Sequence, residues 1–299
     1  MKNVLLLRAP GEDGRDRYET VFEAKGYAPL SVPVLETVLV HVDALRDKIV
    51  RGPDAQDLSG VILTSKRAVE AWCNAIQSIP PPMETVQGLS ADWRTVPFYV
   101  VGDATAAAAS RISTAYPCMV HLVPAENQVR GGAEAGTAER LAEFILEEGC
   151  EGRRLLYLTG DKNRETLPGM LAAGGVALDT LEVYGTTGSS TFRDDLQAAL
   201  ERTLVGESHM YVGNVNVSYG EQWGWVVYFA PSAAAFVTPI LCDVFQRLDV
   251  LKVATIGPTT ASFLRDTLKM RVDVVALKPS PDALCRDVVA FDDGVACTS

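Results

Sequence analysis

Hydroxyl groups and glycines follow four short apolar runs of this chain, each where a strand is expected to pass into a helix. The runs are VILTSKRAVEAW (61–72), YVVGDATAAAAS (99–110), VVYFAPSAAAFV (226–237) and ATIGPTTASFL (254–264). The polar residues at these junctions are Thr64, Ser65, Gly102, Thr105, Ser232, Thr259 and Thr260. Helix N-termini present free N–H groups to anions, and ligands of open α/β sheets bind beyond the carboxyl ends of the strands. We therefore expect these residues to bind an anionic ligand.

Helix capping is the simpler interpretation of any one of these hydroxyls taken alone. A Ser or Thr at a strand-to-helix junction commonly accepts a hydrogen bond from the first turn of the helix, and such a cap is worth about 1 kcal/mol. A cap hydroxyl and its neighbouring N–H groups can serve both the helix and a ligand. The two interpretations therefore stay open together.

Cations at or beside the expected strand ends could meet the carboxylates of a ligand. They are Arg8, Lys66, Lys162 and Arg164. Solvated surface charge is the simpler interpretation of each cation by itself. We expect Arg8, Lys66 and Lys162 to contribute to substrate binding, together with Gly160 at the end of an expected strand.

The chain lacks the residue patterns of a metal site, a disulfide framework or a nucleotide loop. Its six cysteines show no C-x-x-C spacing, and among its three histidines His41 and His121 have no ligand-spaced neighbour. No G-x-G-x-x-G or Walker-type loop is present, which also disfavours a nucleotide-sugar transferase. We expect no metal and no cofactor.

The net charge limits the classes of partner. At −11, with an isoelectric point near 4.8, the chain has no basic stripe for nucleic acid or an anionic membrane surface. No apolar stretch approaches the roughly 18 residues of a membrane span, and the first apolar run is too short for a signal peptide. We expect a cytoplasmic monomer that acts on a small molecule, with no nucleic acid or membrane partner.

The chain is long enough for two domains of about 150 residues, and 47% of its residues are apolar. Strands and helices are expected to alternate regularly, which predicts an α/β fold with doubly wound parallel sheets. Strands are expected at 4–10, 61–63, 97–101, 154–160, 226–229, 252–256 and 272–277. Helices are expected at 18–25, 43–50, 66–76, 104–113, 138–148, 167–173, 194–204, 232–245, 259–268 and 281–291.

Two extended segments, 27–40 and 176–187, predict the domain organisation. The first is marked by Pro29 and Pro33 and the second alternates, so we expect them to contribute two antiparallel connector strands, at 34–39 and 180–186. One domain then combines 1–33 with 187–299, and the other, 40–179, is inserted into it. A cleft between two lobes is expected. The stretch 124–137 is expected to be a flexible loop, and 206–224 a surface insertion.

The order of these segments resembles the uroporphyrinogen-III synthase family. The resemblance is carried by LLLRAPGED, SVPVLE, VILTSKRAVEAW, VVGDATA, YLTGDKNRETLP, EVYGTT, YFAPSAAAF, IGPTTA and KPSPDAL, which together span nearly the whole chain. It implies an enzyme that closes hydroxymethylbilane, a linear tetrapyrrole with eight carboxylates, into a macrocycle while inverting the last ring through a spiro intermediate. Such a reaction depends on positioning more than on a strong acid or base.

Tyr184, in the second extended segment, matches by this resemblance the family's tyrosine proposed to help the substrate hydroxyl depart. A phenol with a pKa of about 10 can donate a hydrogen bond or proton to a leaving hydroxyl. Aromatic packing on a strand is the alternative interpretation of this residue. For the whole chain, the alternative is a non-catalytic two-lobe binding or sensor protein, which would hold a ligand without changing it.

Overall fold

Parallel strands and helices alternate along most of the chain, and the strands gather into two sheets. The structure, a computed structural model, describes residues 2–11, 14–80, 92–205, 223–245 and 248–294. The chain divides into two units, Met1–Glu36 with Thr187–Ser299, and Thr37–Thr186. The second unit is thus continuous in sequence and interrupts the first.

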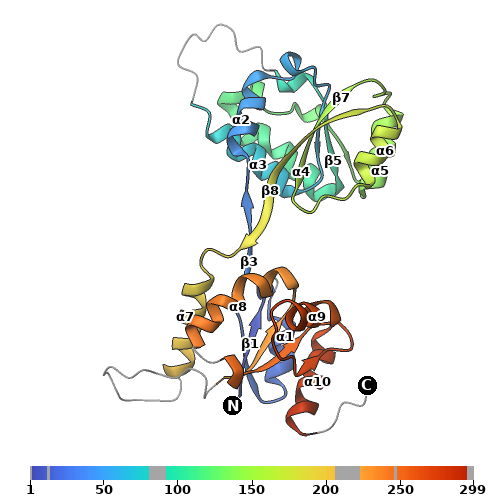
Figure 1. The fold of residues 1–299 in the computed structure, drawn as a ribbon. Coiled ribbons are helices and arrows are strands. Elements are labelled where there is room, and N and C mark those ends of the chain that lie inside the picture. The colour runs from blue at the N-terminus through green and yellow to red at the C-terminus, as the bar shows by residue number, and fades with distance from the viewer. Residues whose placement is uncertain (1, 12–13, 81–91, 206–222, 246–247, 295–299) are drawn as a thin grey trace. The chain divides into compact units, whose positions relative to one another are not determined.

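The unit Thr37–Thr186 is built on a six-stranded sheet of order β3-β8-β7-β4-β5-β6 (Figure 1). Five of its strands, from β8 to β6, pair in parallel. Strand β3 runs antiparallel to β8, because Val40 N–H donates to Val183 C=O and Ser189 N–H donates to Val34 C=O. The strands are β3 (Leu35–Leu39), β4 (Val61–Leu63), β5 (Phe98–Val101), β6 (Val129–Gly132), β7 (Arg154–Gly160) and β8 (Ala177–Gly188).

Helices cover both faces of this sheet, as a doubly wound fold requires. On one face they surround a cluster in which Trp72 packs edge to face against Trp93 and Phe98, with ring centroids 5.0 and 5.1 Å away. On the other face, Tyr99 and Tyr157 belong to a second buried cluster. The first face carries α2 (Val42–Arg51), α3 (Lys66–Gln77) and α4 (Gly102–Ala115), and the second carries α5 (Ala138–Glu147) and α6 (Thr166–Ala173).

The other unit has a five-stranded, all-parallel sheet of order β11-β10-β9-β1-β2. Its strands are β1 (Lys2–Leu7), β2 (Tyr27–Ser31), β9 (Trp223–Tyr228), β10 (Lys252–Thr255) and β11 (Val274–Val275). Helices α7 (Phe192–Val205), α8 (Pro231–Phe245) and α9 (Pro258–Asp266) cover one face, and α1 (Arg17–Glu23) and α10 (Pro281–Asp292) cover the other. The predicted α/β fold with doubly wound parallel sheets is confirmed.

Each sheet has one point at which the strand order reverses. In the unit Thr37–Thr186 the chain runs outward from β4 through β5 and β6, then returns to β7 on the other side of β4. In the other unit the reversal lies between β1 and β9. Ligands of open α/β sheets bind outside the carboxyl ends of the strands at such a switch point. Strands β4 and β7 therefore indicate where a site is expected.

Two expectations from the sequence are wrong, and a third falls largely outside the described residues. The stretch 124–137, expected to be a flexible loop, contains the edge strand β6 and a 3₁₀ turn at Glu126–Gln128. The strand expected at 272–277 is only Val274–Val275. Of the insertion expected at 206–224, all but Trp223 and Gly224, which begin β9, lies outside the described residues. Among the described helices, none combines the length and apolar character needed to cross a membrane.

Candidate active site

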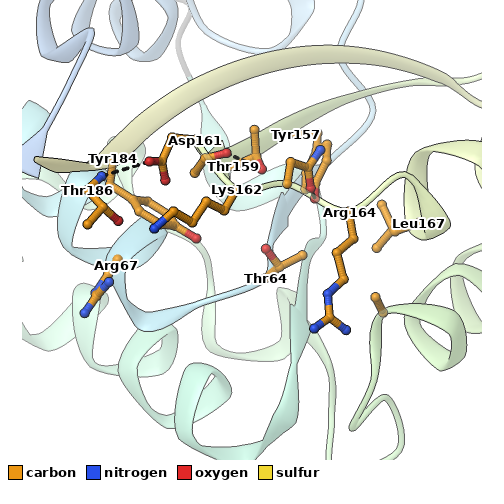
Figure 2. A pocket seen from close by; sticks show the side chains of 13 residues that line it. Thr64, Arg67, Tyr157, Thr159, Asp161, Lys162, Arg164, Leu167, Tyr184 and Thr186 are labelled. Carbon is orange, nitrogen blue, oxygen red and sulfur yellow. Dashed lines mark hydrogen bonds between the residues drawn. The ribbon is translucent and has the colours of Figure 1, made fainter. Parts of the chain in front are cut away.

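A pocket of about 290 Å³ lies at the switch point between β4 and β7 (Figure 2). Thr64 follows β4, and Thr159 and Gly160 end β7. The other lining residues come from the middle of β7, from α3, from the turn between β7 and α6, from the beginnings of α5 and α6, and from β8. They are Arg67, Ala138, Tyr157, Asp161, Lys162, Asn163, Arg164, Leu167, Tyr184 and Thr186. The pocket thus brings together Thr64, Gly160, Lys162 and Tyr184 from the residues predicted by sequence.

A bulge in β8 directs Tyr184 toward this pocket. Thr159 pairs with Glu182 but the next residue, Gly160, pairs with Tyr184, so one extra residue, Val183, is inserted. Strict alternation would place Val183 and Tyr184 on opposite faces of the sheet. Instead both contact the cluster beneath α2, α3 and α4, and the Tyr184 ring lies directly over Gly160. A Cβ atom at position 160 would stand 2.6 Å from Tyr184 Cζ, so the arrangement requires glycine there.

Ser65 orients the Tyr184 hydroxyl. Ser65 is the N-cap of α3, and its Oγ accepts a hydrogen bond of 3.3 Å from Ala68 N–H. The same hydroxyl donates its proton to Tyr184 Oη across 3.0 Å. Because Tyr184 accepts from Ser65, its own O–H remains available to donate to a third group. The capping interpretation of Ser65 is therefore confirmed, and Ser65 itself does not line the pocket but bonds to Tyr184, which does.

Asp161 ties the turn after β7 to the backbone around Tyr184. Its N–H donates to Tyr184 C=O at 3.1 Å, and its carboxylate accepts from Thr186 N–H at 3.0 Å (Figure 2). These two bonds flank Gly185 and hold the backbone of β8 on both sides of it, next to Tyr184. Asp161 therefore fixes the backbone from which the tyrosine projects.

Tyr157 is a second phenol of the pocket. It projects from β7, is 2% exposed, and donates a 2.6 Å hydrogen bond to Asn163 Oδ1 in the turn that follows. Burial raises the pKa of Tyr157 above its usual value, against the opposing effect of the Thr159 and Thr64 hydroxyls. Tyr157 therefore stays protonated at neutral pH and serves as a donor.

Three cations line the pocket, and none forms a salt bridge with a described carboxylate. They are Arg67 at the start of α3 and Lys162 and Arg164 in the turn after β7, and all three are exposed. In the view of Figure 2, Thr64 lies between Arg67 and Arg164. Lys66, the cation predicted at this junction, does not line the pocket, because the helix turns it away from its neighbour Arg67. In a chain of net charge −11, this group is a local attractor for anions.

Gly102 and Thr105 lie at the end of β5, the strand beside β4. Gly102 begins α4 with φ of 72°, and Thr105 is buried in the first turn. Val101 occupies the N-cap of α4 without a side-chain bond. Capping therefore does not explain the Thr105 hydroxyl, contrary to the simpler interpretation from sequence.

The remaining predicted residues belong to the other unit. Arg8 follows β1 at its switch point, forms a 2.6 Å ion pair with Asp16, and lies over the rings of Tyr18 and Phe229. Thr259 is exposed and Thr260 is buried in the first turn of α9, whose N-cap is Gly257, and Ser232 is exposed as the second residue of α8. Neither threonine is an N-cap, so capping does not account for them.

Sequence reasoning missed six polar residues of the pocket, which are Arg67, Tyr157, Thr159, Asp161, Asn163 and Thr186. The motif YLTGDKNRETLP contains four of them, and the order of strands in the sheet would have indicated their junction. Among the described residues, no three His, Cys, Asp or Glu side chains gather as metal ligands would.

The chain is similar over most of its length to proteins of one known family. A model of the family described as "Uroporphyrinogen-III synthase HemD" matches residues 16–286. A curated uroporphyrinogen-III synthase of Schizosaccharomyces pombe is 28% identical over 298 residues, 98% of each chain. One of Saccharomyces cerevisiae is 29% identical over 278 residues, 90% of this chain and 89% of the relative.

Solved structures of the same description are also similar. For uroporphyrinogen-III synthetase from Helicobacter pylori, the TM-score is 0.42 at 15% identity, with 97% of this chain and 99% of that chain covered. For uroporphyrinogen III synthase from Thermus thermophilus, the TM-score is 0.37 at 17% identity, with 99% of this chain and 100% of that chain covered.

Proposed function

The chain belongs to the uroporphyrinogen-III synthase family, and on that basis we propose that it closes hydroxymethylbilane to uroporphyrinogen III. Water is lost, and the last ring is inverted through a spiro intermediate. Family membership does not favour the alternative of a non-catalytic two-lobe binding protein. The observation that carries the proposed mechanism is the Tyr184 phenol, which accepts from Ser65 in a pocket at the switch point of a parallel sheet.

The first chemical step is departure of the terminal hydroxyl. The lone pair of the terminal pyrrole nitrogen forms a new double bond to carbon while the C–O bond breaks, and the oxygen takes up a proton and leaves as water. Tyr184 donates to that oxygen, since its own proton is not used by Ser65. Because the pyrrole nitrogen supplies the electrons, a weak acid suffices, and general acid catalysis typically contributes about 10²- to 10⁴-fold.

The next step determines the product isomer. The reactive azafulvene can close without help, but it then gives the uninverted macrocycle. To give the inverted isomer, the substituted α-carbon of the ring at the opposite end must form the new bond to the azafulvene carbon, which gives the spiro intermediate. The bond that joined that α-carbon to the third ring then breaks and re-forms at the unsubstituted α-carbon of the same ring, which loses its proton. Holding that geometry is a positioning effect, for which effective molarities can be very large.

The cations of the pocket bind carboxylates of the substrate. Arg67, Lys162 and Arg164 have no competing salt bridge among the described residues, so their charges are available to substrate. A volume of about 290 Å³ is at the lower limit of ligand pockets, which span roughly 300–1,000 Å³, so it suits one part of a linear tetrapyrrole. Thr64, Ser65, Gly102, Thr105 and Gly160 add hydroxyl and backbone donors at the same sheet edge. In the other unit we assign carboxylate binding to Arg8, Ser232, Thr259 and Thr260.

The two units serve as the domains, with β3 and β8 as the strands that connect them. We propose a monomer that works in the cytoplasm without metal or cofactor. The described cysteines are free, and Cys150 and Cys285 are buried, which suits a reducing compartment. The strongly acidic composition disfavours a nucleic acid partner.

The test is to incubate the protein with freshly prepared hydroxymethylbilane, oxidise the products and separate the isomers by chromatography. The proposal predicts mainly the type III isomer, at a rate above that of spontaneous closure. Mainly type I product at the spontaneous rate would exclude this function and leave a binding role.

A further inference from the structure

We propose that Tyr157 and Asn163 form a positioning pair, which holds Lys162 and Arg164 in place to bind the carboxylates of the substrate. The inference rests on the proposed function and extends it. Its basis is the 2.6 Å hydrogen bond from Tyr157 Oη to Asn163 Oδ1, in a turn that also carries the exposed cations Lys162 and Arg164. The turn spans 161–165, between the end of β7 and the start of α6.

The turn is fixed at two places. Asp161 is bound to β8 through its N–H and its carboxylate, as described above. Asn163 is bound to Tyr157 on β7. Lys162 lies between these two anchors, and Arg164 directly follows the second. Without the second anchor, the turn would be held firmly only at Asp161.

Fixing the turn lowers the cost of binding an anion. Ordering a residue's backbone costs about 1–2 kcal/mol, and long cationic side chains lose further rotamer freedom when they bind. A turn that is already ordered avoids part of that loss, so preorganisation raises affinity without adding a contact to the ligand. Tyr157 and Asn163 are thus expected to affect how tightly the substrate binds, and Tyr184 how fast it reacts.

Tyr99 provides a matched comparison for Tyr157. Both tyrosines are buried on the same face of the sheet, on either side of Ile62 in β4, and both are bonded through their hydroxyls. Tyr99 donates to Glu148, which does not line the pocket, whereas Tyr157 donates to Asn163, which does. A phenol on this face therefore serves packing in both cases, but only Tyr157 bonds to the turn that carries Lys162 and Arg164.

The test measures kcat and KM for hydroxymethylbilane, and the affinity for uroporphyrin III, an octacarboxylate probe, by fluorescence titration. In Tyr157→Phe and Asn163→Ala we expect KM and the probe's Kd to rise about fivefold, the value of one hydrogen bond, with kcat within about twofold of wild type. Tyr99→Phe should leave all three within about twofold, although it also loses a buried bond. Asn163 is exposed, so its variant tests the pair even if Tyr157→Phe folds poorly.

The double variant Tyr157→Phe/Asn163→Ala tests whether the two side chains act as a pair. If they do, its KM should match that of the single variants, because the same bond is lost once. Unchanged KM and Kd in both single variants, or KM effects that multiply in the double variant, would overturn the inference. The wild-type enzyme would still form the type III isomer in that case, so the proposed function would stand.

Discussion

The Ser65 hydroxyl donates a 3.0 Å hydrogen bond to the phenol oxygen of Tyr184 and thereby joins the start of α3 to β8. The same hydroxyl accepts from Ala68 N–H, so the local requirement for a helix cap also fixes where Tyr184 finds its partner. Because Tyr184 is the acceptor in this bond, its own O–H proton is available for donation to a leaving group.

Replacing Ser65 by glycine separates its two roles. Glycine retains most of an N-cap, so Ser65→Gly should lower the free energy of unfolding by only roughly a few tenths of a kcal/mol. It removes the bond to Tyr184, and we expect kcat to fall about three- to tenfold. Ser280 is a matched control, because it caps α10 through the same 3.3 Å bond, to Ala283 N–H. Equal kcat in Ser65→Gly and Ser280→Gly would contradict a catalytic role for Ser65.

Gly160→Ala should displace the Tyr184 ring. The new methyl group would overlap Tyr184 Cε2 and lie 2.6 Å from Cζ, so the ring must move. A misplacement of about 1 Å can cost about a hundredfold in rate, and overpacking costs about 1–3 kcal/mol of stability. Gly169→Ala, within α6 where a methyl meets nothing within 4 Å, should instead stabilise the protein by about 0.5–1 kcal/mol. Wild-type kcat in folded Gly160→Ala would show that the ring position does not matter.

Arg67 and Lys66 are neighbours in sequence, but only Arg67 lines the pocket. We expect Arg67→Met to raise KM about fivefold and to weaken its dependence on salt, because a charge that meets a substrate carboxylate is lost. Lys66→Met removes the same charge from the outer side of α3 and should change KM less than about twofold. Steady-state kinetics at low and high salt check this. Equal effects of the two variants would mean that only the overall charge matters.

Asp292 is expected to stabilise the unit that contains it, at the end of the sheet opposite to Arg8. Its carboxylate is 5% exposed and accepts from Tyr27, Trp225, Lys252 and Lys2. Burial alone would raise the pKa of Asp292, but these bonds outweigh it and hold the pKa below its usual range. Because the folded pKa is depressed, this stabilisation is present above the unfolded pKa of about 3.9 and is lost as the pH falls toward the folded value.

Asp292→Asn should therefore lower the free energy of unfolding by about 2 kcal/mol at pH 7, since a neutral amide cannot replace the buried carboxylate as acceptor for Tyr27, Trp225 and Lys252 together. The deficit should shrink below about pH 4, where the wild-type group also begins to lose its advantage. Asp282→Asn, on the same helix but in an exposed pair with Arg17, should change stability by less than about 1 kcal/mol. Denaturant unfolding between pH 3 and 7 measures both; a pH-independent difference would contradict the assignment.

Much of the fold could be predicted because hydrophobic periodicity and junction residues are local signals. The strand and helix of VILTSKRAVEAW and the cap at Ser65 follow from that motif alone. Strand β6 was missed because its sequence, VRGG, has little strand propensity. Its Gly131 has φ of 96°, and a Cβ there would lie 2.6 Å from Val100 O. This glycine-rich edge strand forms because it pairs with β5, and the sequence alone does not reveal that tertiary contact.

The site could be predicted only in part, because pocket membership depends on the spatial order of the strands. The chain order places β5 next after β4, whereas in the sheet β7 also adjoins β4 on its other side. Gly102 and Thr105 after β5 therefore looked equivalent to Thr64, but the pocket forms with β7 instead. The bulge at Val183, which brings Tyr184 over Gly160, likewise has no local sequence signal.

The most direct measurement is the rate and isomer composition of the product formed by Tyr184→Phe from fresh hydroxymethylbilane. The ring packing over Gly160 is kept and only the hydroxyl is lost, so fold and KM should be nearly unchanged. We expect kcat to fall about 10²- to 10⁴-fold, as for loss of a general acid, with the enzyme-formed product still mostly type III once spontaneous closure is subtracted. A wild-type rate would make Tyr184 a packing residue, and chiefly uninverted enzymatic product would make it a residue that positions the ring; either result would contradict its role as the proton donor to the departing hydroxyl.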